Sequence, residues 1–282
     1  MSTEQCTLDT CPESAAVYGY RPNLGINVFF TVVFGLVALW SLIVTAWKRR
    51  WISYGIILAV GAVLELVGYL CRALSNGDPF DVDYFSIQFT LLTLAPVFTS
   101  ASIYLSLKYL ATNLGRGHFN ISPKFYTAFF IPSDVIALII QAVGGGLATS
   151  ESTSDNPPPP SDGLLVGTKI TIAGLALQVV SLCTFLILFI AVAVPKRQTS
   201  ISNEPKSVAT NGRRPLYLFM FMLLVATVLI LIRSSYRVAE LSQGLASSLA
   251  TDQWLFVGLD GFMVAIAMAL MVILSPALIL PA

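Results

Sequence analysis

Residues 24–47 read LGINVFFTVVFGLVALWSLIVTAW, a run of 24 residues without Asp, Glu, Lys or Arg. A bilayer core of about 30 Å needs about 20 mostly apolar residues in one helix, so this stretch is long enough to cross it. Six further stretches are also mostly apolar and long enough to cross a bilayer. The seven expected spans are residues 24–47, 52–73, 84–111, 125–148, 165–194, 216–235 and 254–274. The sequence therefore predicts an all-α integral membrane protein, a bundle of seven transmembrane helices.

The composition excludes a water-soluble globular domain. Hydrophobic residues make up 56% of the 282 residues and charged residues 11%, whereas soluble domains have about 45–50% and about 25%. The formal net charge of +1 gives no reason to expect nucleic acid as a partner. Protein partners are not indicated, and no cofactor is implied.

Short polar segments separate the spans, and none is long enough for a second domain. Residues 1–23 are polar and lack the charged-then-apolar pattern of a cleavable signal peptide, so the first span is expected to direct insertion itself. The expected organisation is an extracellular segment at residues 1–23, a seven-span domain at residues 24–276 and the start of a cytosolic tail at residues 277–282.

The placement of Lys and Arg predicts the orientation, because cytosolic loops of membrane proteins are enriched in both. Five basic residues fall on one side of the expected spans: Arg21, Arg72, Lys169, Arg233 and Arg237. Eleven fall on the other side: Lys48, Arg49, Arg50, Lys108, Arg116, Lys124, Lys196, Arg197, Lys206, Arg213 and Arg214. We therefore expect the N-terminus outside and the C-terminus in the cytosol. A further expectation, which does not follow from this charge pattern, is a multi-pass protein of the plasma membrane.

The four cysteines add little to the prediction of the fold or the function. Cys6 and Cys11 are expected outside, where a disulfide is chemically permitted, and a paired and an unpaired state both remain open. Cys71 is expected near the same face. Cys183 lies within a span, where a thiol packs as a small apolar group.

Polar side chains inside the spans are the candidate site residues, since an ionisable group in a membrane helix is costly unless it is paired or hydrated. On the second span, Glu65, Tyr69 and Arg72 share one helical face. The candidate ligand-binding residues are Glu65, Tyr69, Arg72, Gln88, Asp134, Gln141, Gln178, Arg233, Arg237, Glu240 and Asp260. Most of them are expected in the outer half of the bilayer, which predicts a polar cavity that opens outward.

Opposite charges are available to pair within this set: three carboxylates (Glu65, Glu240 and Asp260) and three arginines (Arg72, Arg233 and Arg237). Such residues serve equally as a ligand site or as an ion-pair network that only holds helices together. Asp134 differs, because no cation is expected at its depth. It is expected to be protonated or to hydrogen-bond to a neighbour.

Missing residues argue against several seven-helix functions. The last span has no lysine for a retinal Schiff base, and the single histidine, His118, is too few for a zinc hydrolase. The order Gly258-Leu259-Asp260-Gly261 lacks the Gly-x-Gly-Asp motif of intramembrane aspartic proteases. No phosphate-binding glycine loop with lysine is present, which excludes an ATP-driven pump within this chain.

Several motifs together resemble the fungal lipid-translocating exporter family, the RTA-like seven-span proteins. The motifs are Glu65-x-x-Gly68-Tyr69-x-x-Arg72, Gln88 followed by a segment ending at Tyr104, Asp134 with Gln141-x-x-Gly144-Gly145-Gly146, Gly174 with Gln178, and Arg233-x-x-Tyr236-Arg237-x-x-Glu240 with Asp260. The resemblance extends from about Tyr20 to Pro276. The chain departs from the family at Thr251-Asp252-Gln253 and at Ser275-Pro276, where His-Glu and His-Pro are expected.

The resemblance implies a non-enzymatic translocator of membrane lipids or amphipathic molecules, linked to stress or drug resistance. Ligands of the sphingoid-base, phospholipid, sterol-like or porphyrin-like kind are what it suggests. An alternative is a seven-span ligand sensor that signals to a cytosolic partner through the basic face. A third alternative is an intramembrane enzyme that uses Asp134, Glu65 or Asp260 as an acid or base.

Overall fold

The computed structural model describes residue 16 and residues 18–49, 51–114, 123–152, 165–193, 213–244 and 247–279. Within these ranges all regular secondary structure is helical. The elements are α1 (Leu24–Lys48), α2 (Ile52–Leu74), α3 (Val82–Leu114), α4 (Pro123–Ser152), α5 (Val166–Ala193), α6 (Arg213–Ser242), α7 (Ser248–Thr251), α8 (Gln253–Phe256), the π-helix η4 (Val257–Phe262), α9 (Met263–Ile273) and α10 (Pro276–Ile279).

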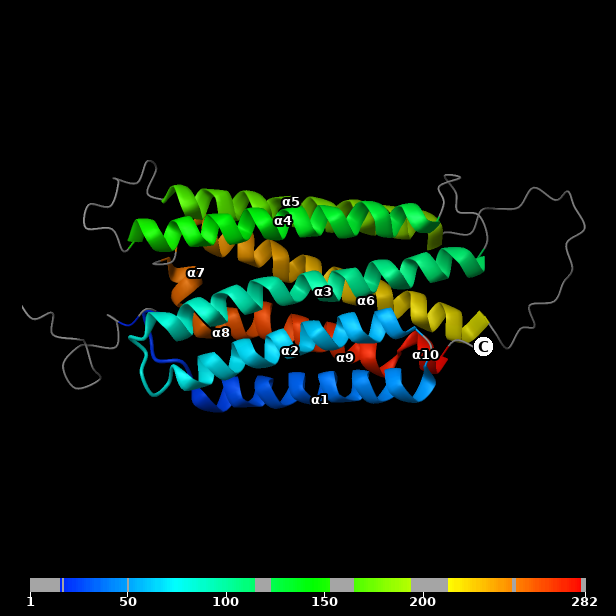
Figure 1. Cartoon of the computed structure of the whole chain (residues 1–282), viewed down its shortest axis with the longest axis horizontal. Helices are drawn as coiled ribbons and strands as arrows, with labels where there is room; N and C mark the ends of the chain where they lie inside the picture. Colours follow the sequence, from blue (N-terminus) through cyan, green and yellow to red (C-terminus); the bar gives the residue numbers. More distant parts are fainter. Residues whose placement is uncertain are drawn as a thin grey trace, which may run out of the picture.

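Seven helices in the described ranges are long and apolar enough to cross a membrane. Six are single helices, α1 to α6, and the seventh runs through α8, η4 and α9. This confirms the expected all-helical class with seven span-capable helices. In Figure 1 successive helices run back and forth along the long axis, with α4 and α5 on one side, α1 and α2 on the other, and α3 and α6 between them.

The helix ends follow local chemistry. The Asn23 side chain accepts a hydrogen bond from the backbone N–H of Ile26 at 3.2 Å and so caps the start of α1. Arg49 ends this helix in a left-handed conformation with φ of 47°. The Asp252 side chain accepts the N–H of Trp254 at 2.9 Å, which caps the start of the seventh span. The caps satisfy backbone donors that a helix start leaves without partners.

Glycines let α4 and α5 pack closely. A Cβ added at Gly144 would lie 2.5 Å from the backbone nitrogen of Thr171, and one at Gly167 would lie 2.1 Å from that of Ala148. By contrast, a Cβ at Gly145 or Gly146 would meet nothing within 4 Å. Of the three consecutive glycines, Gly144 is thus the one that the contact between α4 and α5 requires. Small residues let helices of membrane bundles approach each other closely in this way.

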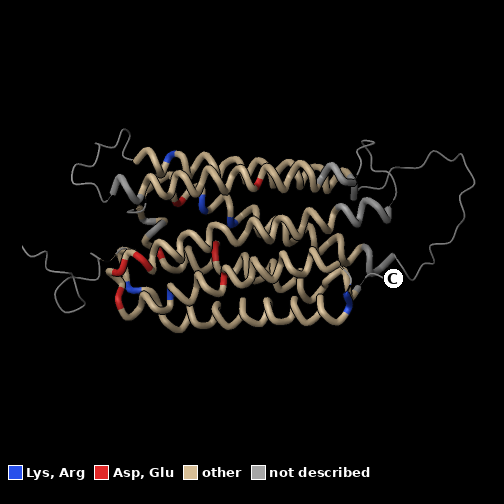
Figure 2. Tube along the Cα trace, viewed as in Figure 1, with Lys and Arg blue, Asp and Glu red and all other residues tan. Residues whose placement is uncertain are grey.

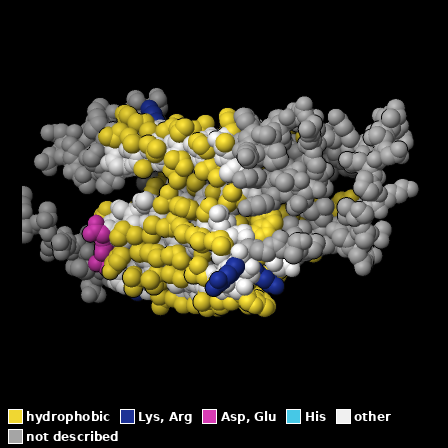
Figure 3. All heavy atoms as spheres, turned by 45° about the vertical axis from the view of Figure 1, so that its right-hand side comes forward, with side chains coloured by type: hydrophobic (Ala, Val, Ile, Leu, Met, Phe, Trp, Pro, Cys, Tyr) yellow, Lys and Arg dark blue, Asp and Glu magenta, His cyan; other side chains and the backbone are white. Residues whose placement is uncertain are grey.

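An apolar belt covers much of the described face drawn in Figure 3, and Figure 2 shows acidic residues gathered toward one end of the bundle. Large hydrophobic side chains are exposed along its helices, among them Leu36, Ile139 and Phe221. One end, called the acidic end below, is where α2 joins α3 and where α8 begins, so it carries Asp78, Asp81, Asp83 and Asp252. The other, the basic end, is where α1 joins α2, so it carries Lys48 and Arg49. A lipid-facing belt of this kind fits a membrane-embedded protein.

Helix positions agree with the grouping of basic residues on one side. Lys108 lies near the end of α3, Lys124 near the start of α4, and Arg213 and Arg214 at the start of α6, all toward the basic end. Arg50, Arg116, Lys196, Arg197 and Lys206 fall outside the described residues. The side of the membrane that each end faces stays a prediction.

Other expectations fall outside the described ranges, namely those for Cys6, Cys11 and His118. Cys71 is a free thiol and is buried at the acidic end of α2, and Cys183 is a free thiol in α5.

Candidate functional site

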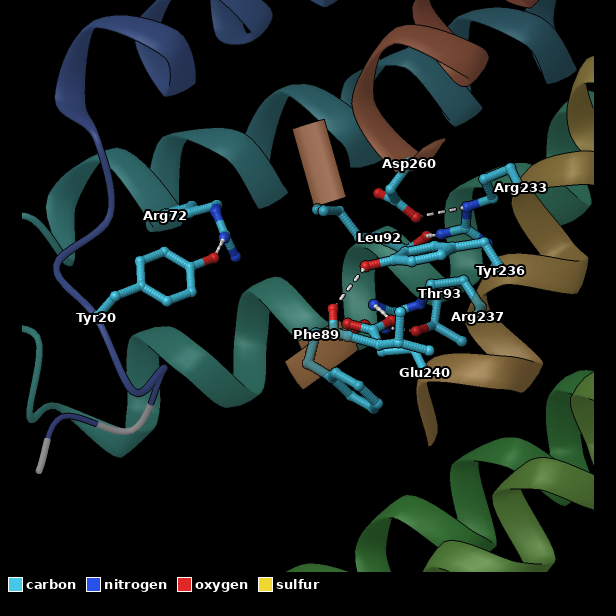
Figure 4. Close-up of polar contacts among 11 residues, drawn as sticks. Tyr20, Arg72, Phe89, Leu92, Thr93, Arg233, Tyr236, Arg237, Glu240 and Asp260 are labelled. Atoms are coloured by element: carbon cyan, nitrogen blue, oxygen red, sulfur yellow. Dashed lines mark hydrogen bonds and ion pairs between the residues drawn. The ribbon is translucent and has the colours of Figure 1, made fainter. Parts of the chain in front are cut away.

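Arg233 holds three elements together inside the bundle. Its Nε lies 2.8 Å from Oδ1 of Asp260, and both side chains are essentially inaccessible. Its Nη2 donates a hydrogen bond to the backbone carbonyl of Leu92, so α6 is connected to η4 and to α3 (Figure 4). Within the described ranges neither Asp260 oxygen accepts a hydrogen bond, so the Arg233–Asp260 contact is one of charge, without aligned N–H geometry.

A π-helix positions Asp260. Residues Val257–Phe262 form η4 near the start of the seventh span, Gln253–Leu278, and single π turns within α-helices are frequent at functional sites. A Cβ at Gly261 would lie 2.7 Å from Cζ of Phe30 and 2.8 Å from the hydroxyl of Tyr69. The absence of a side chain at Gly261 therefore lets η4 lie against α1 and α2 and brings Asp260 to the face of α2 that carries Tyr69.

Glu65 lies on that same face of α2 and is fully buried. Neither of its carboxyl oxygens has a hydrogen-bond partner among the described residues. Asp260, Arg233 and Arg237 are the charged groups that interact with it electrostatically. The hydroxyl of Tyr69, one turn away, also has no partner there. The expectation that Glu65 forms an ion pair is thus wrong, because Arg233 is engaged by Asp260 and Leu92.

A second ion pair lies closer to the acidic end. Nη1 of Arg237 donates to Oε2 of Glu240 at 2.6 Å, one turn further along α6, and both residues are buried. The Arg237 guanidinium also lies 5.0 Å from the centre of the Phe89 ring of α3. Beside it, Tyr236 donates to the carbonyl of Leu249 at 3.2 Å. The pairing of Arg233 and Arg237 with carboxylates confirms two of the expected ion pairs.

The remaining arginine, Arg72, is held by aromatic residues (Figure 4). Its Nη2 donates to the hydroxyl of Tyr20, and its guanidinium lies 5.1 Å, 5.8 Å and 4.1 Å from the ring centres of Tyr18, Tyr20 and Phe256. No carboxylate among the described residues lies within ion-pair distance of it. The expected pairing of Arg72 is therefore wrong, and cation–π contacts replace it.

The segment before α1 covers this part of the acidic end. The Tyr18 hydroxyl donates to Oε1 of Gln88 at 2.7 Å and lies 3.1 Å from Oγ of Ser75. Burial raises the pKa of both Tyr18 and Tyr20, although the charge of Arg72 acts in the opposite direction. Sequence analysis missed both tyrosines because they stand in a polar segment outside the spans. Two aromatic residues at alternate positions, next to a span, were the available indication.

A separate polar region lies between α3, α4 and α5. Tyr104 donates from its hydroxyl to Oδ2 of Asp134 at 3.0 Å, and both are buried. Asp134 lies on the basic-end side of the middle of its span, Thr127–Ala148. Nearer the acidic end, Nε2 of Gln141 donates to Oε1 of Gln178 at 3.3 Å. The hydrogen bond of Asp134 to a neighbour confirms one of its two expected states.

The eleven predicted residues thus fall into three regions. The charged layer contains Glu65, Tyr69, Arg233, Arg237, Glu240 and Asp260. The aromatic cap contains Arg72 and Gln88 with Tyr18, Tyr20 and Phe256. The α4–α5 region contains Asp134, Gln141 and Gln178 with Tyr104. All eleven are buried.

Comparison with known proteins identifies the family. A sequence model described as RTA1 like protein matches residues 58–282. The chain belongs to the RTA1-like family. The matched part of this RTA1-like chain includes the whole charged layer and the α4–α5 region, whereas Tyr18 and Tyr20 of the aromatic cap precede it.

Curated relatives of this RTA1-like chain come from Saccharomyces cerevisiae. It is 31% identical over 301 residues to the sphingoid long-chain base transporter RSB1 of strain Lalvin EC1118 / Prise de mousse, covering 95% of this chain and 76% of that protein. It is 28% identical to Protein RTA1 of strain ATCC 204508 / S288c, covering 92% and 84%. It is 29% identical to protoporphyrin uptake protein 1 of that strain, covering 76% and 64%. No solved structure matches the chain.

The described part of this RTA1-like chain has no group of three or more His, Cys, Asp or Glu side chains able to hold a metal ion. A cavity of about 10 Å³ lies at the basic end and is lined by residues including Ser41, Tyr54 and Ser275. It is about the size of one water molecule and lies away from the charged layer. The outward-opening polar cavity expected from the sequence stays a prediction.

Proposed function

We propose that this RTA1-like protein moves lipids or other amphipathic molecules across its membrane, without enzymatic chemistry. The observation that carries the proposal is the charged layer itself, which buries two ion pairs and Glu65, a carboxyl without a hydrogen-bond partner among the described residues, inside a membrane bundle. Ionisable groups at this depth are costly and are characteristic of substrate or ion pathways. The relatives named for sphingoid long-chain bases and protoporphyrin support amphipathic ligands.

The charged layer and its neighbours are the proposed binding site for the polar head of the ligand. An amphiphile places its head among polar groups and its tail among apolar ones. The bundle has polar and apolar side chains together at the depth of the charged layer. Gln88 and Arg72 stand between the charged layer and the acidic end, so the proposed entrance is at that end. The cavity opens there when the aromatic cap moves aside.

The acidic end is the proposed outer side. The reason is the positive-inside rule, since the basic residues gather at the opposite end. This orientation puts the N-terminus outside and the C-terminus in the cytosol. We further propose the plasma membrane as the location and stress or drug resistance as the physiological setting, both from the family resemblance.

Reconstitution tests the proposal. Purified protein in phosphatidylcholine vesicles is expected to speed transbilayer movement of a fluorescent long-chain base or of a labelled lysolipid, relative to protein-free vesicles. The double variant R233Q/D260N removes both charges of one ion pair while keeping a polar amide at each position, and it is expected to lose this movement. D83N is the matched control, because Asp83 is an exposed carboxylate at the acidic end.

The outcomes separate the candidate functions. Wild-type protein that neither binds nor moves any labelled long-chain base, lysolipid or porphyrin contradicts the proposal. Binding without net movement, together with ligand-dependent recruitment of a cytosolic protein, supports a sensor instead. A chemically altered ligand recovered after incubation supports an enzyme.

A further inference from the structure

The charged layer has one more acid than base. It contains the carboxyl groups of Glu65, Glu240 and Asp260 and the guanidinium groups of Arg233 and Arg237. The third arginine, Arg72, does not belong to the layer, because three aromatic residues hold it at the acidic end: Tyr18, Tyr20 and Phe256. If every group in the layer were ionised, the layer would carry one uncompensated negative charge.

The geometry assigns that extra charge to Glu65. Asp260 lies 2.8 Å from Arg233, and Glu240 lies 2.6 Å from Arg237, so each of these carboxylates has its own cation. Glu65 is fully buried, and neither of its oxygens receives a hydrogen bond from any described residue. A bare carboxylate in such a place is strongly unfavourable. It needs either a proton or an external cation.

Among the described residues, no neighbouring element supplies that cation. From α6, Arg233 and Arg237 face Glu65 but are paired, and from η4, Asp260 adds a like charge. On α2 itself, Tyr69 lies one turn from Glu65 and carries a hydroxyl without a hydrogen-bond partner among the described residues. The α1 side chains packed on Tyr69 are apolar, Phe30 and Phe34. On α3, the carbonyl of Leu92 already accepts from Arg233.

We propose that Glu65 is an exchange site at which a proton and the cationic head of the amphiphile replace one another, so that ligand movement is coupled to proton movement. This inference rests on the proposed function and names its substrate class, amphiphiles with an ammonium head. When the ligand arrives, the O–H bond of the Glu65 carboxyl breaks, the proton leaves to water, and the ammonium becomes the charge partner of the carboxylate. The reverse step protonates Glu65 and releases the ligand.

The face of α2 provides a route for the proton. Glu65, Tyr69 and Arg72 lie at spacings of four and three residues, so they form one stripe from the charged layer to the acidic end. The Tyr69 hydroxyl lies midway and has no partner among the described residues. It can therefore accept one hydrogen bond and donate another along the route of the proton. Tyr69 is a positioning residue in this scheme, and Glu65 carries the exchanged proton.

The test uses a long-chain base trimethylated on nitrogen as the probe, because its charge does not change with pH. Its binding to detergent-purified full-length protein is measured between about pH 5 and pH 8. One competing proton raises the Kd about tenfold for each unit of falling pH below the midpoint. Proton release on ligand binding is read by a pH-sensitive dye in weakly buffered solution. Below the midpoint pH about one proton appears per ligand bound, whereas well above the midpoint pH no proton is released.

Variants locate the effect. E65Q is expected to abolish both the pH dependence of the Kd and the proton release, while D83N, a matched carboxylate-to-amide change on the surface, is expected to retain both. If E65Q does not fold, the wild-type pH profile and proton count still decide, since a slope of zero overturns the inference. The same slope in folded E65Q as in wild type also overturns it, because another group then carries the proton.

Failures of the two proposals are distinguishable. Wild-type protein that binds and moves the trimethylated base with no pH dependence and no proton release contradicts the exchange site and leaves the translocator intact. An uncharged or anionic amphiphile that moves in place of the cationic one contradicts the exchange site in the same way. Protein that binds and moves no amphiphile at all contradicts the proposed function and the exchange site together.

Discussion

The charged layer and the α4–α5 region both bury polar side chains in a membrane bundle, but they satisfy them differently. The α4–α5 region uses hydrogen bonds such as Gln141 to Gln178, between helices that are adjacent in sequence and held close by glycines. The charged layer uses one ion pair that connects α6 to η4, a second ion pair within α6, and a hydrogen bond from Arg233 to the Leu92 carbonyl of α3. Uncharged amides are therefore sufficient to join neighbouring helices. From this comparison we infer that the charges of the charged layer do more than join neighbouring helices.

Breaking the charged layer should have the largest effect. Arg233→Ala leaves Asp260 buried without its cation and frees the carbonyl of Leu92, so we expect a loss of about 3–5 kcal/mol in stability. Thermal unfolding followed by size-exclusion chromatography in detergent measures it. The double variant R233Q/D260N removes both charges and should recover much of the loss. Equal instability of the single and double variants would show that the ion pair contributes little.

The glycine contact of the α4–α5 region gives the next largest effect. Gly144→Ala places a methyl group 2.5 Å from the backbone of Thr171, which cannot yield as a flexible side chain would. Overpacking of this kind costs about 1–3 kcal/mol. The neighbouring change Gly145→Ala meets nothing within 4 Å and is the control, expected to be neutral or slightly stabilising. A lower melting temperature for Gly145→Ala than for Gly144→Ala would contradict this packing.

Asp134 sharpens the comparison, because it is an acid in the region without ion pairs. Asp134→Asn keeps an oxygen that accepts the Tyr104 hydroxyl, so the cost in stability should stay below about 1 kcal/mol. Transport of the labelled base should fall more than folded yield does. Tyr104→Phe removes the donor and serves as the comparison variant. A yield that falls in parallel with activity in both variants would assign Asp134 a structural role.

The aromatic cap predicts a small pH effect. The pKa values of Tyr18 and Tyr20 are raised by burial in the folded protein, so above pH about 10 the unfolded chain loses these protons first. The folded state then binds more protons than the unfolded state, and stability falls as pH rises. Melting temperatures between about pH 9 and pH 11 should drop less in Y18F/Y20F than in wild type. Identical slopes would mean that the cap has opened before the tyrosines titrate.

Part of the site was predictable because membrane burial makes any polar side chain conspicuous. Glu65, Asp134 and Asp260 could be found by their type alone, since the surrounding residues are apolar. The pairings could not be found this way, because Arg72, Arg233 and Arg237 are equivalent in a list of charges. Tyr104 and Tyr236 stood in the family motifs but not among the candidate site residues, since tyrosines are common in membrane helices and their partners lie on other elements.

The sequence by itself determined that this chain forms seven apolar helices, which side of the bundle gathers the basic residues, and which buried residues are polar. Those properties follow from local composition, because a bilayer selects helices by length and hydrophobicity alone. The tertiary structure decided which charges meet. Helix rotation and the π-helix at Val257–Phe262 bring Asp260 to Arg233, and the segment with Tyr18 and Tyr20 takes Arg72 away from the carboxylates. These contacts between elements far apart in the sequence leave Glu65 without a hydrogen-bond or ion-pair partner among the described residues.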